Sequence, residues 1–167
     1  MTRRYVLMGV SGCGKTSVGR ALARQGALAF VDGDTLHPQS NIDKMASGVP
    51  LDDADRAPWL GHVGRVLAGH DGPVAIGCSA LKRQYRDLIR REAGAAVHFV
   101  HLAAPRAVLQ ARVDARAGHF MPPALLDSQY AALEPLEPDE SGQVIDIAQP
   151  FDQVVAAAAD YVKGTMK

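Results

Sequence analysis

The sequence predicts an α/β fold, a doubly wound five-stranded parallel sheet covered by helices on both faces. Short apolar runs bounded by glycine or turn residues alternate along the chain with segments of helical periodicity. The runs are continuously apolar, as in strands buried on both faces of a sheet, and a glycine-rich loop joins the first run to the first helical segment. Such strand–helix alternation implies parallel pairing through right-handed crossovers.

Five apolar runs are the predicted strands. They cover residues 5–8, 28–31, 74–78, 97–102 and 144–147, the last being the weakest match. The first run is closed by Gly9, and the second by Asp32-Gly33-Asp34, a turn composition that places two carboxylates at the carboxyl end of a strand.

Helical spacing of apolar residues fills most of the intervals. The predicted helices cover residues 15–25, 53–69, 82–92, 105–117 and 151–163, with Pro58, Pro105 and Gly164 expected as boundaries. Residues 36–55 and 118–138 interrupt the alternation. Because ligands of such sheets bind at the carboxyl ends of the strands, we expect a substrate-binding insertion at about 36–60 and a lid at about 116–135.

The length of the chain favours a single domain, residues 1–167, and its low cysteine content favours a reducing compartment. The 18 basic residues balance 18 acidic ones, so no strong basic field is present for nucleic acid or an anionic membrane. The two cysteines do not suggest a disulfide framework, and no apolar stretch reaches the roughly 18 residues of a spanning helix. We expect a cytoplasmic protein without nucleic-acid or membrane partners.

The loop from Gly9 to Thr16 matches the phosphate-binding pattern G-x-x-x-x-G-K-[ST] between a predicted strand and a predicted helix. Its backbone N–H groups and the helix N-terminus suit a nucleotide phosphate, and Lys15 suits the β- and γ-phosphates. The Thr16 hydroxyl is the expected ligand of Mg²⁺. The candidate ATP-binding residues are Gly9, Ser11, Gly12, Cys13, Gly14, Lys15, Thr16 and Ser17.

A phosphate loop alone leaves three classes open: a kinase, a nucleotide-dependent switch and an ATPase motor. A switch of the GTPase type needs N-K-x-D, but residues 41–44 have these letters in the wrong order, and the D-x-x-G at 139–142 comes too late. A motor needs an acidic residue after a hydrophobic strand, whereas the 74–78 strand ends in Cys78, followed by Ser79. A small-molecule kinase fits best.

Asp32 and Asp34 supply the carboxylates that such a kinase needs. Phosphoryl transfer requires positioning, charge neutralisation and a carboxylate that orients or deprotonates the attacking hydroxyl. We assign the acceptor hydroxyl to Asp34 and a water-bridged Mg²⁺ contact to Asp32. The alternative is a turn with a helix N-cap, since aspartate favours both.

Further segments resemble the gluconokinase family. They are Asp-Gly-Asp-Thr-Leu-His-Pro at 32–38, Asn-Ile-Asp-Lys-Met at 41–45, Gly-Val-Pro-Leu-Asp-Asp at 48–53, Cys-Ser-Ala-Leu-Lys-Arg at 78–83 and Gly-His-Phe at 118–120. Together with the phosphate loop they span most of the chain. The resemblance implies transfer of the γ-phosphoryl group of ATP to the 6-hydroxyl of D-gluconate, a P-loop NTPase fold of the adenylate/shikimate kinase type with a lid, and a homodimer.

The resemblance also suggests which residues bind the acceptor. A sugar acid needs a cationic fork for its carboxylate and polar groups for its hydroxyls. The candidates besides Asp34 are His37, Lys44, Arg56, Lys82, Arg83 and His119, with Arg56 the first choice for the carboxylate. The alternatives are a surface salt bridge for Arg56 with Asp52, Asp53 or Asp55, a solvated first helical turn for Lys82 and Arg83, and an ordinary helix-terminal residue for His37.

By analogy with related kinases, Arg112 is predicted to stack on adenine and Arg116 to close on the transferring phosphate. Their spacing of four puts them on one helical face, and the alternative is a solvated basic face. Within this fold, a shikimate- or nucleotide-kinase-like activity remains the second candidate.

Overall fold

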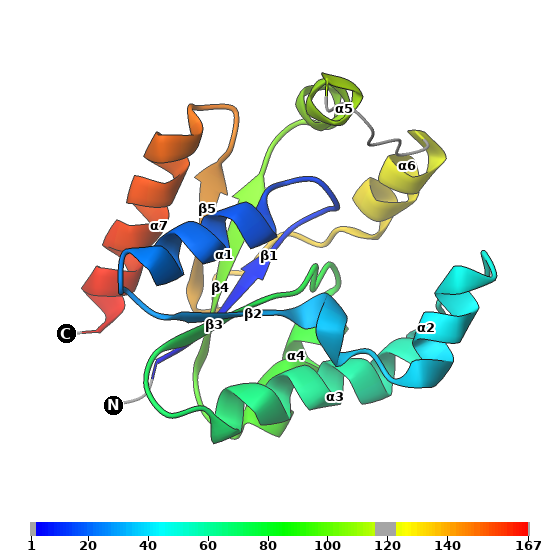
Figure 1. The fold of residues 1–167 in the computed structure, drawn as a ribbon, viewed down its shortest axis with the longest axis horizontal. Coiled ribbons are helices and arrows are strands. Elements are labelled where there is room, and N and C mark those ends of the chain that lie inside the picture. The colour runs from blue at the N-terminus through cyan, green and yellow to red at the C-terminus, as the bar shows by residue number, and fades with distance from the viewer. Residues whose placement is uncertain (1–2, 116–122, 167) are drawn as a thin grey trace.

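The computed structural model describes residues 3–115 and 123–166. It contains a five-stranded, all-parallel sheet in the order β2-β3-β1-β4-β5 (Figure 1). The strands are β1 (Arg4–Met8), β2 (Ala29–Asp32), β3 (Val74–Gly77), β4 (Val97–Ala103) and β5 (Gly142–Asp146). The predicted doubly wound α/β sheet is therefore confirmed.

Helices cover both faces of this sheet. They are α1 (Lys15–Arg24), α2 (Gln39–Ala46), α3 (Asp53–Gly69), α4 (Arg83–Ala93), α5 (Arg106–Ala115), α6 (Pro123–Ala132) and α7 (Phe151–Thr165), with a short 3-10 helix, η1 (Gly33–Leu36). Helices α1 and α7 lie on one face, and α3 and α4 on the other (Figure 1). Helix α2 projects from the body beyond the end of α3.

The central strand β1 divides the core into two layers. Tyr5 and Leu7 pack with the residues of α1 and α7, whereas Val6 and Met8 pack with those of α3 and α4, and all four are at most 1% exposed. This alternation follows from the two-residue period of a strand. A strand buried on both sides explains why the run at 5–8 is apolar throughout.

Helices α3 and α4 approach closely at Gly64. A Cβ atom there would lie 2.7 Å from both the Cβ atom of Glu92 and the carbonyl oxygen of Ile89. Glycine at this position thus permits the close contact between α3 and α4.

Two predicted boundaries were wrong. Pro58 lies inside α3, because the helix already begins at Asp53 under a capping box formed by Asp52 and Asp55. Gly164 lies inside α7, which continues to Thr165. The interruptions at 36–55 and 118–138 also hold helices, α2 and α6, that periodicity did not predict. No helix in the described part of the chain is long and apolar enough to cross a membrane.

Candidate active site

The phosphate loop connects β1 to α1. Gly14 caps α1 with a left-handed φ of 100°, and Gly9 has a φ of 144°. A Cβ at Gly9 would lie 2.7 Å from the carbonyl oxygen of Leu102, so this position needs glycine for both its conformation and its space. The loop therefore has the strand–turn–helix geometry that presents backbone N–H groups to an anion.

A polar cavity of about 220 Å³ lies over the N-terminus of α1. Its lining consists of Ser11, Gly12, Gly14, Lys15, Thr16, Ser17 and Asp34. The ammonium group of Lys15 folds back onto the loop, where it donates to the carbonyl oxygens of Gly9 at 2.8 Å and Val10 at 3.1 Å. Asp34, in η1 directly after β2, thus lines the same cavity as Lys15 and Thr16.

Thr16 lines this cavity, whereas the carboxylate of Asp32, predicted to contact Mg²⁺ through water, is engaged elsewhere. The carboxylate of Asp32 accepts the backbone N–H of Asp34 at 3.0 Å and caps η1, and Asp32 lines a different hollow beside Arg20 and Arg24. The helix cap given as the alternative is thus present at Asp32, because the Asp-x-Asp spacing closes a local turn, and its contact with Mg²⁺ stays a prediction. Among the described residues no cluster of three His, Cys, Asp or Glu side chains could hold a metal ion.

A second cavity, of about 360 Å³, lies behind the phosphate loop. Gly12, Gly14 and Ser17 line it on the loop side, and Val18, Val113, Ile147, Phe151 and Val154 add apolar surface. Arg112 borders it, its guanidinium donating to the carbonyl oxygen of Ile147. An apolar slot with an arginine at its edge suits a flat nucleobase.

Sequence reasoning missed Ile147 and Phe151 as part of this slot. Both follow β5, and the carboxyl-end location of ligand sites pointed to this edge of the sheet. The 144–147 run was, however, the weakest strand signal in the sequence.

Next to residues predicted to bind the acceptor substrate, the carboxylate of Asp53 is surrounded by donors from α3 and from the start of α4. Tyr85 donates its hydroxyl at 2.5 Å and Gln84 its amide at 3.0 Å, while Arg56 and Lys82 lie at 3.5 and 3.8 Å. Both cations also lie over the Tyr85 ring. Burial of the Tyr85 hydroxyl and its bond to Asp53 raise the pKa of Tyr85 to about 12. The salt-bridge alternative for Arg56 is thus present, and its partner is Asp53.

His37 follows η1 and feels the charges of both Asp34 and Arg56. Its ring stacks on Trp59 with centroids 4.1 Å apart, and Trp59 itself donates to the carbonyl oxygen of Gly33 at 2.9 Å. The Asn41 amide lies 3.1 Å from Nδ1 of His37. Burial lowers the pKa of His37, against the opposing charge of Asp34 and with help from Arg56, so the imidazole is neutral at neutral pH.

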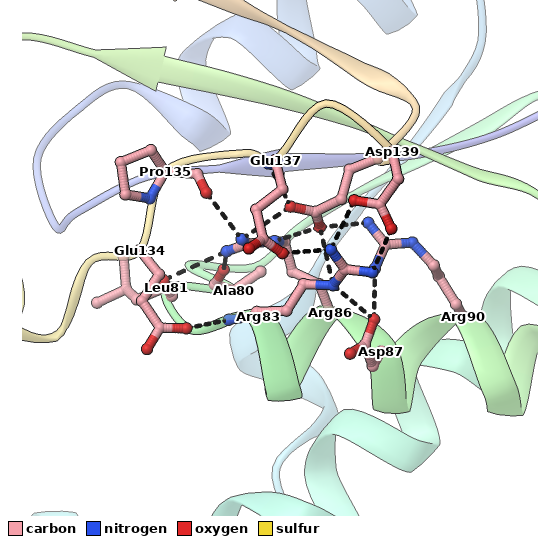
Figure 2. A network of polar contacts seen from close by, with 11 residues as sticks. Ala80, Leu81, Arg83, Arg86, Asp87, Arg90, Glu134, Pro135, Glu137 and Asp139 are labelled. Atoms are coloured by element: carbon pink, nitrogen blue, oxygen red, sulfur yellow. Dashed lines mark hydrogen bonds and ion pairs between the residues drawn. The ribbon is translucent and has the colours of Figure 1, made fainter.

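Two predicted acceptor-binding cations are engaged elsewhere. Arg83 binds Asp87 at 2.9 Å and Asp139 at 2.8 Å and also contacts Glu137, so it points along α4 toward the 137–139 turn rather than into the cavity (Figure 2). In the structure Arg83 is thus paired with three carboxylates, and its role as an acceptor ligand stays a prediction. Lys44 is paired with Asp55 at 2.7 Å. Arg116 and His119 lie outside the described residues.

Comparison with known proteins decides the family. A protein-family model described as an AAA domain matches residues 5–136. The thermoresistant gluconokinase of Escherichia coli (strain K12) is 44% identical over 163 residues, covering 95% of this chain and 93% of that protein. The chain belongs to the gluconokinase family.

A crystal structure of a gluconokinase from Sinorhizobium meliloti 1021 superimposes on this fold with a TM-score of 0.89 at 44% identity, covering 98% of this chain and 93% of that one. A shikimate kinase from Bacteroides thetaiotaomicron, at 17% identity and a TM-score of 0.66 over 98% of each chain, shares the fold alone. The gluconokinase likeness thus extends through both the phosphate loop and the acceptor segments, whereas the shikimate kinase likeness concerns the scaffold.

Proposed function

We propose that the protein is a gluconokinase that transfers the γ-phosphoryl group of ATP to D-gluconate and yields 6-phosphogluconate and ADP. The observation that carries the proposal is the cavity shared by Lys15, Thr16 and Asp34. It brings together a phosphate-binding cation, a hydroxyl suited to magnesium and a carboxylate suited to an attacking hydroxyl, which are the parts that phosphoryl transfer requires.

On the nucleotide side, the first-turn N–H groups of α1 and Lys15 bind the phosphates, and the slot beside Arg112 takes the adenine. Thr16 is the protein ligand that we assign to Mg²⁺, which would offset the phosphate charge. Asp34 accepts the hydrogen bond of the acceptor hydroxyl and receives its proton as the phosphorus–oxygen bond forms.

On the acceptor side, Arg56 and Lys82 bind the carboxylate of gluconate. In the structure these cations surround Asp53, so a carboxylate already occupies the position that we assign to the acid group of the substrate. The substrate carboxylate would then compete with Asp53 for the same donors. His37, as a neutral ring near Asp34, can both donate to and accept from a sugar hydroxyl.

Several finer assignments rest on the family likeness. We infer a homodimer, a cytoplasmic location and a lid at about 116–135, with Arg116 acting on the transferring phosphate and His119 on the acceptor. Lys44, held by Asp55, remains a candidate for an acceptor hydroxyl.

An ADP-release assay with a panel of acceptors tests this function. We expect turnover with ATP and D-gluconate and background rates with shikimate, glucose and nucleoside monophosphates. Turnover of shikimate or of a nucleotide without turnover of gluconate would favour the second candidate function. ATP hydrolysis that is independent of any acceptor would point to a switch or a motor.

A further inference from the structure

Gln129, on α6, makes a two-point contact with the phosphate loop. Its Oε1 accepts the backbone N–H of Ser11 at 2.6 Å, and its Nε2 donates to the Ser11 hydroxyl at 2.8 Å. Because a backbone N–H can only donate, the carbonyl end of the amide must face it, which leaves the NH₂ end for the hydroxyl. The side chain therefore fixes both the backbone and the rotamer of Ser11.

The segment that begins with Gln129 also holds the acceptor loop. Glu134 donates its backbone N–H to the carbonyl oxygen of Leu81 at 2.7 Å, and its carboxylate accepts the backbone N–H of Arg83 at 2.7 Å. Between these ends, Tyr130 donates its hydroxyl to the carbonyl oxygen of Ala104 at 2.7 Å. One short segment, 129–134, is thus bonded to the loops that follow β1, β3 and β4.

The acceptor-loop end of this segment is rigidly fixed. Arg86 donates to the carbonyl oxygens of Ala80 at 2.9 Å and Pro135 at 3.3 Å, and it pairs with Glu140 at 2.7 Å with both side chains fully buried. Ala80 has a φ of 47°, a left-handed conformation that a non-glycine residue keeps only when its surroundings impose it. The segment that carries Gln129 is therefore anchored at its acceptor-loop end, where the lid that we infer at about 116–135 ends.

Gln129 and a nucleotide need not compete for the same donors. The N–H groups at the N-terminus of α1 lack acceptors within the helix and are the natural phosphate donors. Ser11 lies four residues before Lys15, the first residue of α1, and its N–H is already satisfied by Gln129. With a nucleotide phosphate bound at the helix start, the loop would be held from two sides, by the phosphate and by α6 at Ser11.

We propose that Gln129 is a positioning residue for phosphoryl transfer. It acts through Ser11 to hold the phosphate loop at a fixed position relative to the acceptor loop at 78–83. The proposal rests on the proposed kinase function. In-line phosphoryl transfer needs the nucleotide on the phosphate loop and the acceptor near the 78–83 loop to be at the right distance from each other. A displacement of about 1 Å between them can cost on the order of 100-fold in rate. Gln129 does not touch the reacting atoms; its effect passes through Ser11.

The test compares Gln129→Met and Gln129→Ala with a matched control, Ser128→Ala, in ATP-dependent phosphorylation of gluconate. Methionine retains the length of the side chain but neither hydrogen bond. Ser128 is the neighbouring residue on α6, exposed, and its hydroxyl bonds within the helix to the carbonyl oxygen of Leu125. We expect both Gln129 variants to lose about 10-fold or more in kcat, from the sensitivity of rate to position, with KM for ATP within about 2-fold and ADP affinity unchanged. Ser128→Ala should match the wild type.

A double-mutant cycle with Ser11→Ala tests the route of the effect. If Gln129 acts through Ser11, the loss caused by Gln129→Met should be smaller in the Ser11→Ala background than in the wild type. Ser11→Ala removes the bond to the hydroxyl but keeps the bond to the backbone N–H, so part of the loss should persist in that background. Full additivity would overturn a role of the Ser11 hydroxyl. An unchanged kcat in both Gln129 variants would overturn the whole proposal, as would tighter ADP binding, which would mean that the amide competes with phosphate. A drop in Tm of Gln129→Met with kcat unchanged would assign a purely structural role. Wild-type protein without gluconate kinase activity would instead contradict the proposed function itself.

Discussion

Arg86 and Glu140 form an ion pair at 2.7 Å in which both side chains are fully buried. The same arginine reaches the carbonyl oxygens of Ala80 and Leu81, so the pair joins the acceptor loop to the segment before β5. Figure 2 shows Arg86 and its neighbours on α4 pointing into that segment. The pair is thus a structural link beside the active site.

Glu140→Gln should therefore lower the free energy of unfolding by about 3 kcal/mol or more, because it leaves the Arg86 charge buried without its counter-ion. Urea denaturation measures this loss. Asp139→Asn is the control, since Asp139 is 69% exposed and its pair with Arg83 should contribute no more than about 1 kcal/mol. Equal losses in the two variants would contradict a special role for the buried pair.

The stabilisation from Glu140 should disappear in acid. Burial opposes ionisation of Glu140, but hydrogen bonds from Arg86 and Arg90 outweigh it and lower its pKa from 4.5 to about 2. A carboxyl whose pKa falls on folding stabilises the native state fully above its unfolded pKa, and loses this effect as the pH falls through the folded pKa. The difference in unfolding free energy between wild type and Glu140→Gln should be constant above about pH 5 and shrink between pH 4.5 and 2. A difference that does not change with pH would contradict this.

Asp34→Asn should reduce kcat by about 100-fold or more, the usual contribution of a positioned base, while nucleotide binding changes little. Asp32→Asn is the matched control. Asparagine can still accept the N–H of Asp34 and cap η1, so kcat should fall far less. Steady-state kinetics with ADP titrations separate the two effects. A larger loss at Asp32 than at Asp34 would restore the magnesium role predicted for Asp32 from the sequence.

Lys15→Ala should damage nucleotide binding and turnover together, because its ammonium group neutralises phosphate charge in both the bound and the transition state. The measurement is the affinity for ATP and ADP beside kcat. A variant that loses turnover but binds ATP normally would limit Lys15 to the transition state.

Arg56→Ala should raise KM for gluconate about 10-fold or more and leave KM for ATP unchanged, since a charged hydrogen bond to the substrate carboxylate is lost. Arg65→Ala, on the same helix but paired with Glu92 at 3.4 Å, is the control. A neutral polyol in place of gluconate refines the test. If Arg56 binds the carboxylate, the preference of the wild type for the acid should shrink in Arg56→Ala; an unchanged preference would contradict this assignment.

The fold was predictable because its signals are local. Buried strands such as 5–8 and 97–102 are continuous apolar runs, and the phosphate loop has its own residue pattern between a strand and a helix. The helix predicted at 53–69 has the bounds of α3, although Pro58, expected as a boundary, lies inside it. Helix α6 could not be predicted, because its mixture of exposed and buried residues has little periodicity and its contacts come from distant loops.

The sequence predicted the candidate site residues that belong to local motifs, but not the residues whose partners are distant along the chain. Thr16 was predicted from the phosphate-loop pattern and Asp34 from the Asp-Gly-Asp turn after a strand, and both line one cavity in the structure. Arg83 and Arg86 could not be distinguished in advance, because their partners at 137–140 lie more than fifty residues away along the chain. The same holds for Gln129, whose partner Ser11 is 118 residues away.

The most direct test of the account is to identify the product formed from ATP and D-gluconate by ³¹P and ¹³C NMR. The account predicts one equivalent of ADP for each 6-phosphogluconate, with phosphorus coupled to C6. ADP formed without phosphogluconate, or phosphate carried on another hydroxyl, would contradict the central claim that Asp34 directs the 6-hydroxyl of gluconate to the γ-phosphate of ATP.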